Sequence, residues 1–384
     1  ARKLPPIGRD LTGVDFALIN WNAQRPDNFF GADTRKLFVA SGAKLVRFWT
    51  FCPPLELAPE AGRYNWTRFD AQMAKIKAAG ARTIMTCCFT PTWLSVDGTK
   101  EGMPKDWDAY EKLIADTVAH CRDKGWPVAY WEVWNEPDLK DGFLKGDLPE
   151  LCELYHHFVN AVRSADPKAK VGGPALAGAN MVWLKGFAKF CHDRKLPLDF
   201  ASWHVYDLMP ADLAASATSA RKVLADWPDY ANLPLVIDEW NASGGPENAW
   251  DTPYAAAFQI SALHKMLEAG VTASVFFAFK ESAYRTGGKT FGGSWGMITH
   301  NDVPKPSFHS FRMFAKLTGP RLGVSGGDGQ VGAIACETKV GMDVVLYRFD
   351  PDPRATKRTV SVEISGDVAY KLASAELIDA THSN

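Results

Sequence analysis

The chain has 384 residues, of which 46% are hydrophobic, so it can bury more core than a single domain usually holds. Its 43 basic and 44 acidic residues leave a formal charge of −1, so no overall field attracts the chain to nucleic acid or to an anionic membrane. The chain contains no apolar run of about 18 residues, and no membrane span is therefore predicted.

Strand-like apolar runs alternate with helical patterns along most of the chain. Between the runs, apolar residues recur at helical spacing, for example at Leu151, Leu154, Tyr155 and Phe158. Such a pattern predicts an α/β fold with a parallel sheet covered by helices, and eight units predict a closed (β/α)8 TIM barrel. A doubly wound open sheet is the alternative, but no glycine-rich phosphate turn follows the first run. The predicted barrel strands are residues 12–17, 44–49, 82–88, 129–135, 169–173, 198–206, 235–239 and 273–279.

The pattern changes after a last barrel helix, which we expect at residues 306–317. Gly319 and Pro320 interrupt the chain there, and the later runs alternate with a period of two. We therefore predict a barrel domain over residues 11–319 and a small C-terminal antiparallel β-domain, similar to a β-sandwich, over residues 320–384. Residues 1–10 can add an edge strand to it. The predicted strands of the small domain are residues 331–338, 343–349, 358–364 and 369–378.

Two features of the chain bear on the compartment in which it works. The seven cysteines are an odd number without a C-x-x-C spacing, so we expect buried thiols with no metal or redox role. The chain begins Ala1-Arg2-Lys3, with neither a methionine nor a secretion signal, and we expect a processed form. A periplasmic or secreted location is favoured over the cytoplasm.

Two glutamates at strand ends carry the functional prediction. One apolar run ends in Asn135-Glu136-Pro137, where the proline stops the strand, and another ends in Glu239. The active site of a (β/α)8 barrel lies at the carboxyl ends of its strands, and the fourth and seventh strands, which carry these acids, face each other. Glycoside cleavage needs one protonated and one ionised carboxyl group. The pair therefore predicts acid–base catalysis on a sugar.

The motif at residues 131–137, WEVWNEP, resembles the acid/base signature of the clan A glycoside hydrolases. The whole pattern is most similar to family 39, which includes β-xylosidases and α-L-iduronidases, and the resemblance extends to residues 171–175, 199–206 and 304–308. It implies that Glu136 is the general acid/base, Glu239 the nucleophile and Asn135 the residue that holds the sugar 2-hydroxyl. A retaining double displacement follows, with the carboxyl groups ~5–5.5 Å apart and with neither a metal nor an organic cofactor.

Three further residues are predicted to support the pair. His204 and Tyr206 share one face of the sixth strand, where the clan has groups that orient the nucleophile or touch the sugar; a satisfied core histidine is the alternative. Arg47 on the second strand is either a cation that keeps the nucleophile ionised or the partner of Glu132 in a structural ion pair. We expect Asp238 to point away from the nucleophile and to be structural.

Aromatic and basic residues after the strands are candidates for substrate binding. Four tryptophans can stack on sugar rings or pack in the core: Trp49, Trp93, Trp240 and Trp295. Lys280, with Arg285 and Lys289, can bind a uronate carboxylate or form part of a solvated loop.

The sequence thus predicts a retaining glycoside hydrolase, β-xylosidase-like in family, that acts on plant or microbial polysaccharides or the oligosaccharides derived from them. A uronide- or exopolysaccharide-directed glycosidase of the same family is one alternative, and a non-catalytic carbohydrate-binding barrel is another. A metal-dependent barrel hydrolase lacks ligands, because only His204 among the nine histidines falls on a predicted barrel strand.

Overall fold

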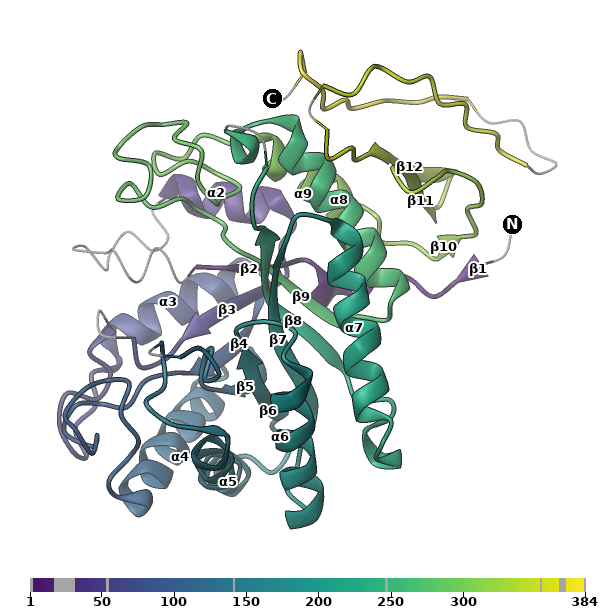
Figure 1. Ribbon diagram of the computed structural model, residues 1–384. Helices are drawn as coiled ribbons and strands as arrows, with labels where there is room; N and C mark the ends of the chain where they lie inside the picture. The colour runs from purple at the N-terminus through teal and green to yellow at the C-terminus, as the bar shows by residue number, and fades with distance from the viewer. Residues whose placement is uncertain are drawn as a thin grey trace.

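Eight parallel strands close into a barrel in the computed structural model, which describes residues 3–16, 32–52, 55–140, 142–245, 248–352, 354–365 and 371–382 (Figure 1). Each strand pairs with its neighbours in chain order, and β9 returns to pair with β2. The barrel strands are β2 (Gly13–Asp15), β3 (Leu45–Trp49), β4 (Arg82–Cys87), β5 (Val128–Val133), β6 (Val171–Leu176), β7 (Phe200–Asp207), β8 (Leu235–Ala242) and β9 (Ala273–Phe276). Every predicted barrel strand overlaps one of them, and the predicted fold class is confirmed. The end of the first predicted strand, Ala17, lies outside the described residues.

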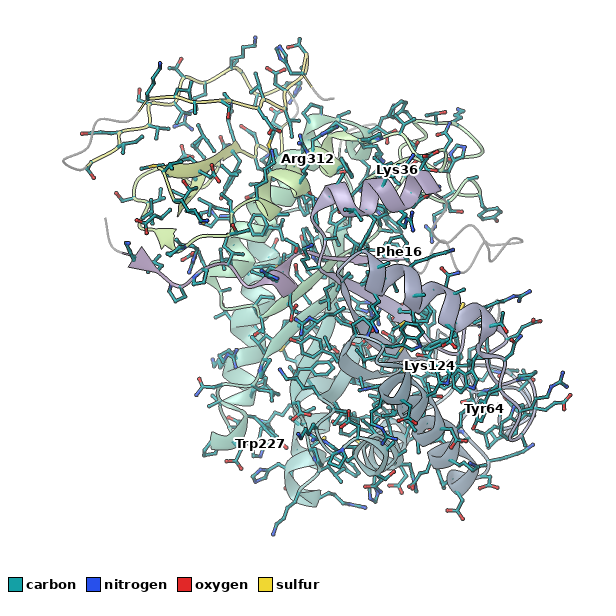
Figure 2. The ribbon with its side chains drawn as sticks, turned by 180° about the vertical axis from the view of Figure 1, so that it is seen from behind. Phe16, Lys36, Tyr64, Lys124, Trp227 and Arg312 are labelled. Carbon is teal, nitrogen blue, oxygen red and sulfur yellow. The ribbon has the colours of Figure 1, made fainter. Side chains whose placement is uncertain are left out.

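Helices surround the barrel in both views of the molecule (Figures 1 and 2). The sequence marks their ends: Asp147 and Glu150 form a capping box at the start of α5, and Gly125 adopts the left-handed conformation that ends α4. The apolar stripe predicted on α5 is buried. The helices are α2 (Ala32–Ser41), α3 (Trp66–Ala78), α4 (Trp107–Lys124), α5 (Leu148–Ala165), α6 (Met181–Arg194), α7 (Pro210–Leu224), α8 (Pro253–Glu268) and α9 (Pro306–Ala315), with 3₁₀ turns η1 (Arg9–Leu11), η4 (Pro228–Tyr230) and η5 (Ala249–Asp251).

The barrel interior is layered, with an apolar layer below a charged one. The apolar layer joins side chains from six barrel strands, among them Leu45, Tyr130 and Val236. Two residues further along the same strands, Arg47 and Glu132 occupy the next layer, because alternate residues of a strand face the same side. The charged layer therefore lies toward the carboxyl ends of the strands, where a barrel binds its ligands.

A second sheet lies beside the barrel, next to α8 and α9 (Figure 1). It consists of antiparallel strands in the order β1 (Lys3–Leu4), β10 (Arg321–Leu322), β11 (Val331–Glu337) and β12 (Met342–Arg348), so the predicted N-terminal edge strand is confirmed. Phe349 packs its ring against Tyr254 and Phe258 of α8. The domain boundary between residues 319 and 320 stays a prediction.

The two other strands predicted for the small domain are wrong. Residues 358–364 and 371–378 form no strand, and residues 369–370 lie outside the described part of the chain. The segment does alternate apolar and polar residues, but Val360, Val362 and Ile364 remain 37–53% exposed. An alternating pattern is therefore not enough to form a strand, because a strand also needs a neighbouring strand to which it can hydrogen-bond.

Two smaller expectations concern membranes and thiols. Within the described ranges, no helix is long and apolar enough to cross a membrane. All seven cysteines are buried and unpaired, and burial raises the pKa of Cys87 to about 12, so that its thiol is unreactive at neutral pH.

Candidate active site

Arg47 stands at the centre of the charged layer, fully buried on β3. Its Nε donates to Glu132 Oε2 at 3.0 Å, Nη1 to Glu239 Oε2 at 3.2 Å and Nη2 to Asn135 Oδ1 at 2.8 Å. It thus meets both roles that the sequence left open, the ion pair with Glu132 and the contact with Glu239. One rigid guanidinium fixes groups from two opposite sides of the barrel.

Glu136 follows β5 in a strained segment. Trp134 and Glu136 have φ values of 59° and 46°, in the left-handed region that residues other than glycine rarely adopt. The Glu136 amide donates to the carbonyl of Ala175 at 2.7 Å, while the indole of Trp134 donates to the Phe143 carbonyl. These bonds hold a turn that lifts Glu136 to the barrel mouth, where 16% of its side chain is exposed.

Asp138, the last residue of the same turn, has a structural role in the adjoining loop. Its carboxylate accepts from the amide of Ala177 at 2.8 Å and from the side chain of Asn180 at 2.9 Å. Asp138 therefore joins the segment after β5 to the segment after β6.

Glu239 lies on β8 with both carboxylate oxygens hydrogen-bonded. Tyr206 Oη donates to Oε1 at 2.5 Å, and Arg47 donates to Oε2. Burial raises the pKa of Glu239, and the charges of His204 and Arg47 together with the Tyr206 hydrogen bond pull it back. A carboxylate that accepts two such bonds is held as an oriented anion.

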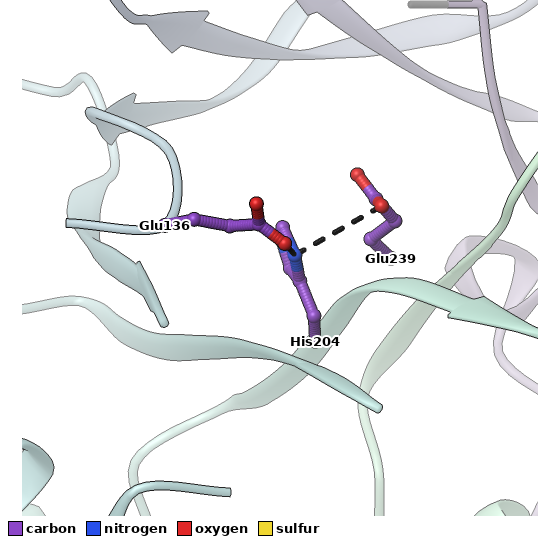
Figure 3. A group of neighbouring side chains, drawn as sticks. All are labelled: Glu136, His204 and Glu239. Carbon is purple, nitrogen blue, oxygen red and sulfur yellow. Dashed lines mark hydrogen bonds and ion pairs between the residues drawn. The ribbon is translucent and has the colours of Figure 1, made fainter. Parts of the chain in front are cut away.

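His204 connects the two glutamates (Figure 3). Its Nδ1 lies 2.9 Å from Glu136 Oε1 and 4.0 Å from Glu239 Oε1, and its Nε2 lies 3.4 Å from Asp238 Oδ2. Burial acts against the charged ring, but the carboxylates of Glu239 and Asp238 outweigh it and raise the pKa of His204 well above the usual range. Both ring nitrogens face carboxylates, so the ring is best satisfied as an imidazolium.

Asp238 is placed differently from the prediction that it points away from Glu239. The pairing of β7 with β8 shifts register between Trp203 and His204, and that of β8 with β9 shifts between Ile237 and Trp240. This irregularity turns two consecutive acids inward, and Asp238 Oδ2 comes within 3.1 Å of Arg47 Nη2. Arg47 and His204 hold the pKa of Asp238 below its usual range, although burial opposes them.

The arrangement suits proton transfer and nucleophilic attack. Oxygen atoms of Glu136 and Glu239 and a ring nitrogen of His204 lie within 4.8 Å of one another, and each carboxyl retains some access to solvent. Among the described residues this is the cluster that could also hold a cation. A cation would need the lone pair of His204, whereas the surrounding carboxylates favour a proton on that ring. The chemistry of the donor set therefore favours acid–base work.

The four candidate tryptophans divide by burial. Trp240 is fully buried and packs edge-on against Phe276, so its prediction as a stacking platform is wrong: the irregularity in β8 turns it outward into the helix layer. Trp49 is also buried, beneath the rings of Phe89 and Phe143, and is not an open platform either.

The two others are half-buried at the barrel mouth. Trp295 lies 5.4 Å from the ring of Tyr206, and the guanidinium of Arg285 lies 5.0 Å from the Trp295 ring. Trp93, after β4, donates to the Ala58 carbonyl at 3.0 Å. Trp295 thus adjoins Tyr206, the residue that holds Glu239.

Lys280 is engaged elsewhere. Its ammonium lies 2.9 Å from Asp302 Oδ1 and donates to Thr34 Oγ1 at 3.1 Å, a pairing that joins the loop after β9 to α2. This contact accounts for its charge without a substrate carboxylate.

A buried ion cluster that the sequence did not predict supports the Trp295 loop. Lys305 Nζ lies 2.6 Å from both Asp251 and Glu281 and donates to the Ser294 carbonyl, next to Trp295. Burial raises the pKa of Glu281 to about 7, against the pull of Lys305. The only indication of this cluster in the sequence was that Lys305 belongs to the segment 304–308, which carries part of the family resemblance.

Comparison with known proteins places this geometry in a family context. The family model described as Glycosyl hydrolases family 39 matches residues 59–384. The β-xylosidase of Caldicellulosiruptor saccharolyticus is 29% identical over 288 residues, which cover 67% of this chain and 58% of that protein. The β-xylosidase of Geobacillus stearothermophilus is 29% identical over 289 residues, covering 66% and 56%. The chain therefore spans a little over half the length of these curated relatives.

Solved structures share the fold. A family 39 glycoside hydrolase from Xanthomonas axonopodis pv. citri superposes with a TM-score of 0.75 at 21% identity, over 93% of this chain and 77% of that chain. A monomeric β-xylosidase from Caulobacter crescentus CB15 gives a TM-score of 0.72 at 23% identity, over 88% and 73%. At these identities the likeness shows the architecture of barrel and accessory sheet.

Proposed function

Since the chain belongs to glycosyl hydrolase family 39, as its sequence predicted, we propose that it is a retaining glycoside hydrolase that uses Glu239 as nucleophile and Glu136 as acid/base. The observation that carries this proposal is the approach of the two carboxyls, whose oxygens lie within 4.8 Å. A retaining site needs carboxyls about 5–5.5 Å apart, whereas an inverting site leaves about 6.5–9.5 Å for a water molecule. The short separation favours direct attack by Glu239.

The proposed reaction has two displacements. Glu239 attacks the anomeric carbon while Glu136 protonates the departing oxygen; water then attacks the glycosyl ester while Glu136 takes its proton. His204 lies against Glu136 and stabilises its anion after the first step. Asn135 Oδ1 accepts from Arg47, which leaves the amide nitrogen to donate to a sugar 2-hydroxyl.

We propose β-xylosides as the first substrates to test, because both curated relatives are named β-xylosidases. A uronide is the second candidate, and Arg285 is the observation that favours it. The side chain of Arg285 is exposed and stacks on Trp295, beside the proposed site, whereas Lys280 is already paired. The expectation that the enzyme is exported stays a prediction.

Aryl β-xylosides, α-L-arabinosides, α-L-iduronides and β-glucosides, assayed in parallel with oligosaccharides, would identify the sugar. Methanol added to the best substrate should give a methyl glycoside of unchanged anomeric configuration, and an inverted product would refute the mechanism. Azide should restore turnover to E239A with inverted product and to E136A with retained product, because each leaves a cavity on a different face of the sugar. Full turnover by E239A without azide would contradict the assignment.

A further inference from the structure

The charged layer holds more carboxyl groups than cations. Asp15, Glu132, Asp238 and Glu239 all lie within 3.6 Å of the guanidinium of Arg47, and the first three are completely shielded from solvent. An ionised carboxyl in a barrel interior is costly unless a cation balances it. Even with His204 charged, the cations are fewer than the acids. At least one of these carboxyls therefore keeps its proton.

The hydrogen-bond pattern distinguishes Glu132 and Asp238 from the other acids. Oε2 of Glu132 accepts from Arg47 Nε and, at 2.8 Å, from Thr86 Oγ1. Oε1 of Glu132 is buried and has no donor, and neither oxygen of Asp238 receives a bond of good geometry. The two acids are nevertheless in hydrogen-bonding contact with each other. Two carboxylates cannot bond to each other, whereas an Oε1–H on Glu132 would satisfy both.

We infer that Glu132 keeps a proton at neutral pH and donates it to Asp238, so that Arg47 and His204 face three carboxylates, those of Asp15, Asp238 and Glu239, rather than four. Glu132 is then a positioning residue, which acts on the nucleophile through Arg47. Its effect on catalysis rests on the proposed function, but the location of the proton does not.

The other groups that face Glu132 are compatible with a neutral carboxyl. From β4 it meets the hydroxyl of Thr86 and the thiol of Cys87, which burial keeps protonated. From β3 it meets Arg47, and Asp15 on β2 approaches the far side of the same guanidinium. Burial and the charge of Asp238 raise the pKa of Glu132 to about 8, against the pull of Arg47.

A matched pair of variants tests the inference through the acid limb of kcat/KM, which reports protonation of the nucleophile. Glu132 and Asp238 contact Arg47 at 3.0 and 3.1 Å and differ in the proposed proton. E132Q replaces a neutral group by a neutral one, so we expect the limb to stay within about 0.3 pH units of wild type. D238N removes a true anion, and the limb should move to lower pH by about one unit.

Infrared spectroscopy gives a readout that needs no activity. At pH 7 the wild-type protein should show the carbonyl band of a protonated carboxyl that is absent from E132Q, and this band should titrate near pH 8. D238N should move its titration to lower pH, because the anion that favours the proton is gone. D15N, which removes an acid next to Arg47 but not next to Glu132, should leave the band unchanged.

Each other result overturns the inference. Absence of the band from wild type at pH 7, or its loss in D15N instead of E132Q, places the proton elsewhere. A shift of the acid limb in E132Q as large as in D238N shows that Glu132 is ionised. If no glycoside is cleaved, the proposed function fails while the infrared band still decides the position of the proton.

Discussion

The hydroxyl of Tyr206 donates to Oε1 of Glu239 at 2.5 Å, and this bond gives the proposed nucleophile its orientation. Arg47 holds the other oxygen, so rotation of the carboxylate would break both bonds. Tyr206 lies on β7 and Glu239 on β8, which are neighbouring strands of the barrel. Without this hydrogen bond, Glu239 would be held only by charged groups. Tyr206 in turn packs beside Trp295, so the nucleophile is coupled to the wall of the site.

Removal of this hydroxyl should weaken catalysis without unfolding the protein. A hydrogen bond to a charged group contributes about 1.5–3 kcal/mol, so Y206F should lower kcat/KM by about tenfold to a hundredfold. The Tyr206 bond also lowers the pKa of Glu239, and its loss should move the acid limb of the pH profile to higher pH. Steady-state kinetics between pH 4 and pH 8 would check both effects. An unchanged limb would show that the hydroxyl does not contact the ionised acid.

His204 should make the stability of the protein depend on pH. Its pKa is raised in the folded state, so its stabilising contribution is complete below the ordinary histidine value of 6.5 and is lost as the pH rises through the folded value. The free energy of unfolding should therefore fall as the pH increases above 6.5. Urea denaturation at several pH values in this range would measure the unfolding free energy, which should fall less steeply with pH for H204N than for wild type.

Glu132 should also make the protein less stable as the pH rises, starting at a lower pH than His204. Its pKa is raised from 4.5 to about 8 in the folded state, so its stabilising contribution is complete below pH 4.5 and is lost as the pH rises to about 8. H204N should retain this part of the slope, and the double variant with E132Q should lose it. Equal slopes in all three proteins would contradict both assignments.

Sequence periodicity was sufficient to predict the barrel and to bring the two candidate glutamates to one site. Near-continuous apolar runs marked every barrel strand, and counting them placed Glu136 and Glu239 on opposite sides of the mouth. Strand parity also placed Arg47 and Glu132 in one layer, because each lies two residues after a member of the apolar layer, Leu45 or Tyr130. These predictions depend on local patterns, which a sequence carries directly.

The errors arose where the structure departs from regular pairing. Asp238 shares the inward face of Val236, and the register shifts of β8 bring Glu239 inward beside it and turn Trp240 outward; no residue pattern marks such an irregularity. The pairing of Lys280 with Asp302 depends on how the loop after β9 folds back, which the sequence does not specify. The exposed alternation around Val362 shows that a strand pattern needs a partner to become a strand.

Two tryptophans near the site should respond in opposite ways to removal. Trp240 is fully buried, and W240A should cost about 3–5 kcal/mol of stability, because it leaves a cavity in the helix layer. Trp295 is half-buried beside Tyr206, so W295A should lose less stability but raise KM by about three- to tenfold, as expected for one lost aromatic contact. Urea unfolding and Michaelis–Menten kinetics would separate the two. A larger KM effect from W240F than from W295F would contradict this division.

The Lys305 cluster should be more sensitive to substitution than the neighbouring pair of Lys280 and Asp302. Lys305 is fully buried against Asp251 and Glu281, so K305M leaves two buried acids without a cation and should cost about 3–5 kcal/mol at neutral pH. K280M breaks a partly exposed pair and should cost about 1 kcal/mol or less.

The loss in K305M should also depend on pH. The pKa of Glu281 is already raised to about 7 by burial, and without Lys305 it should rise further, so at low pH this acid is neutral and tolerates the missing cation. The difference in unfolding free energy between wild type and K305M should therefore shrink as the pH falls below 7 and grow above it. Because Lys305 also binds the Ser294 carbonyl next to Trp295, K305M should raise KM at alkaline pH, where the cluster is least stable. Urea titrations at pH 5, 7 and 9, with KM measured at the same values, would test this link, and a pH-independent loss would show that the cluster does not ionise as described.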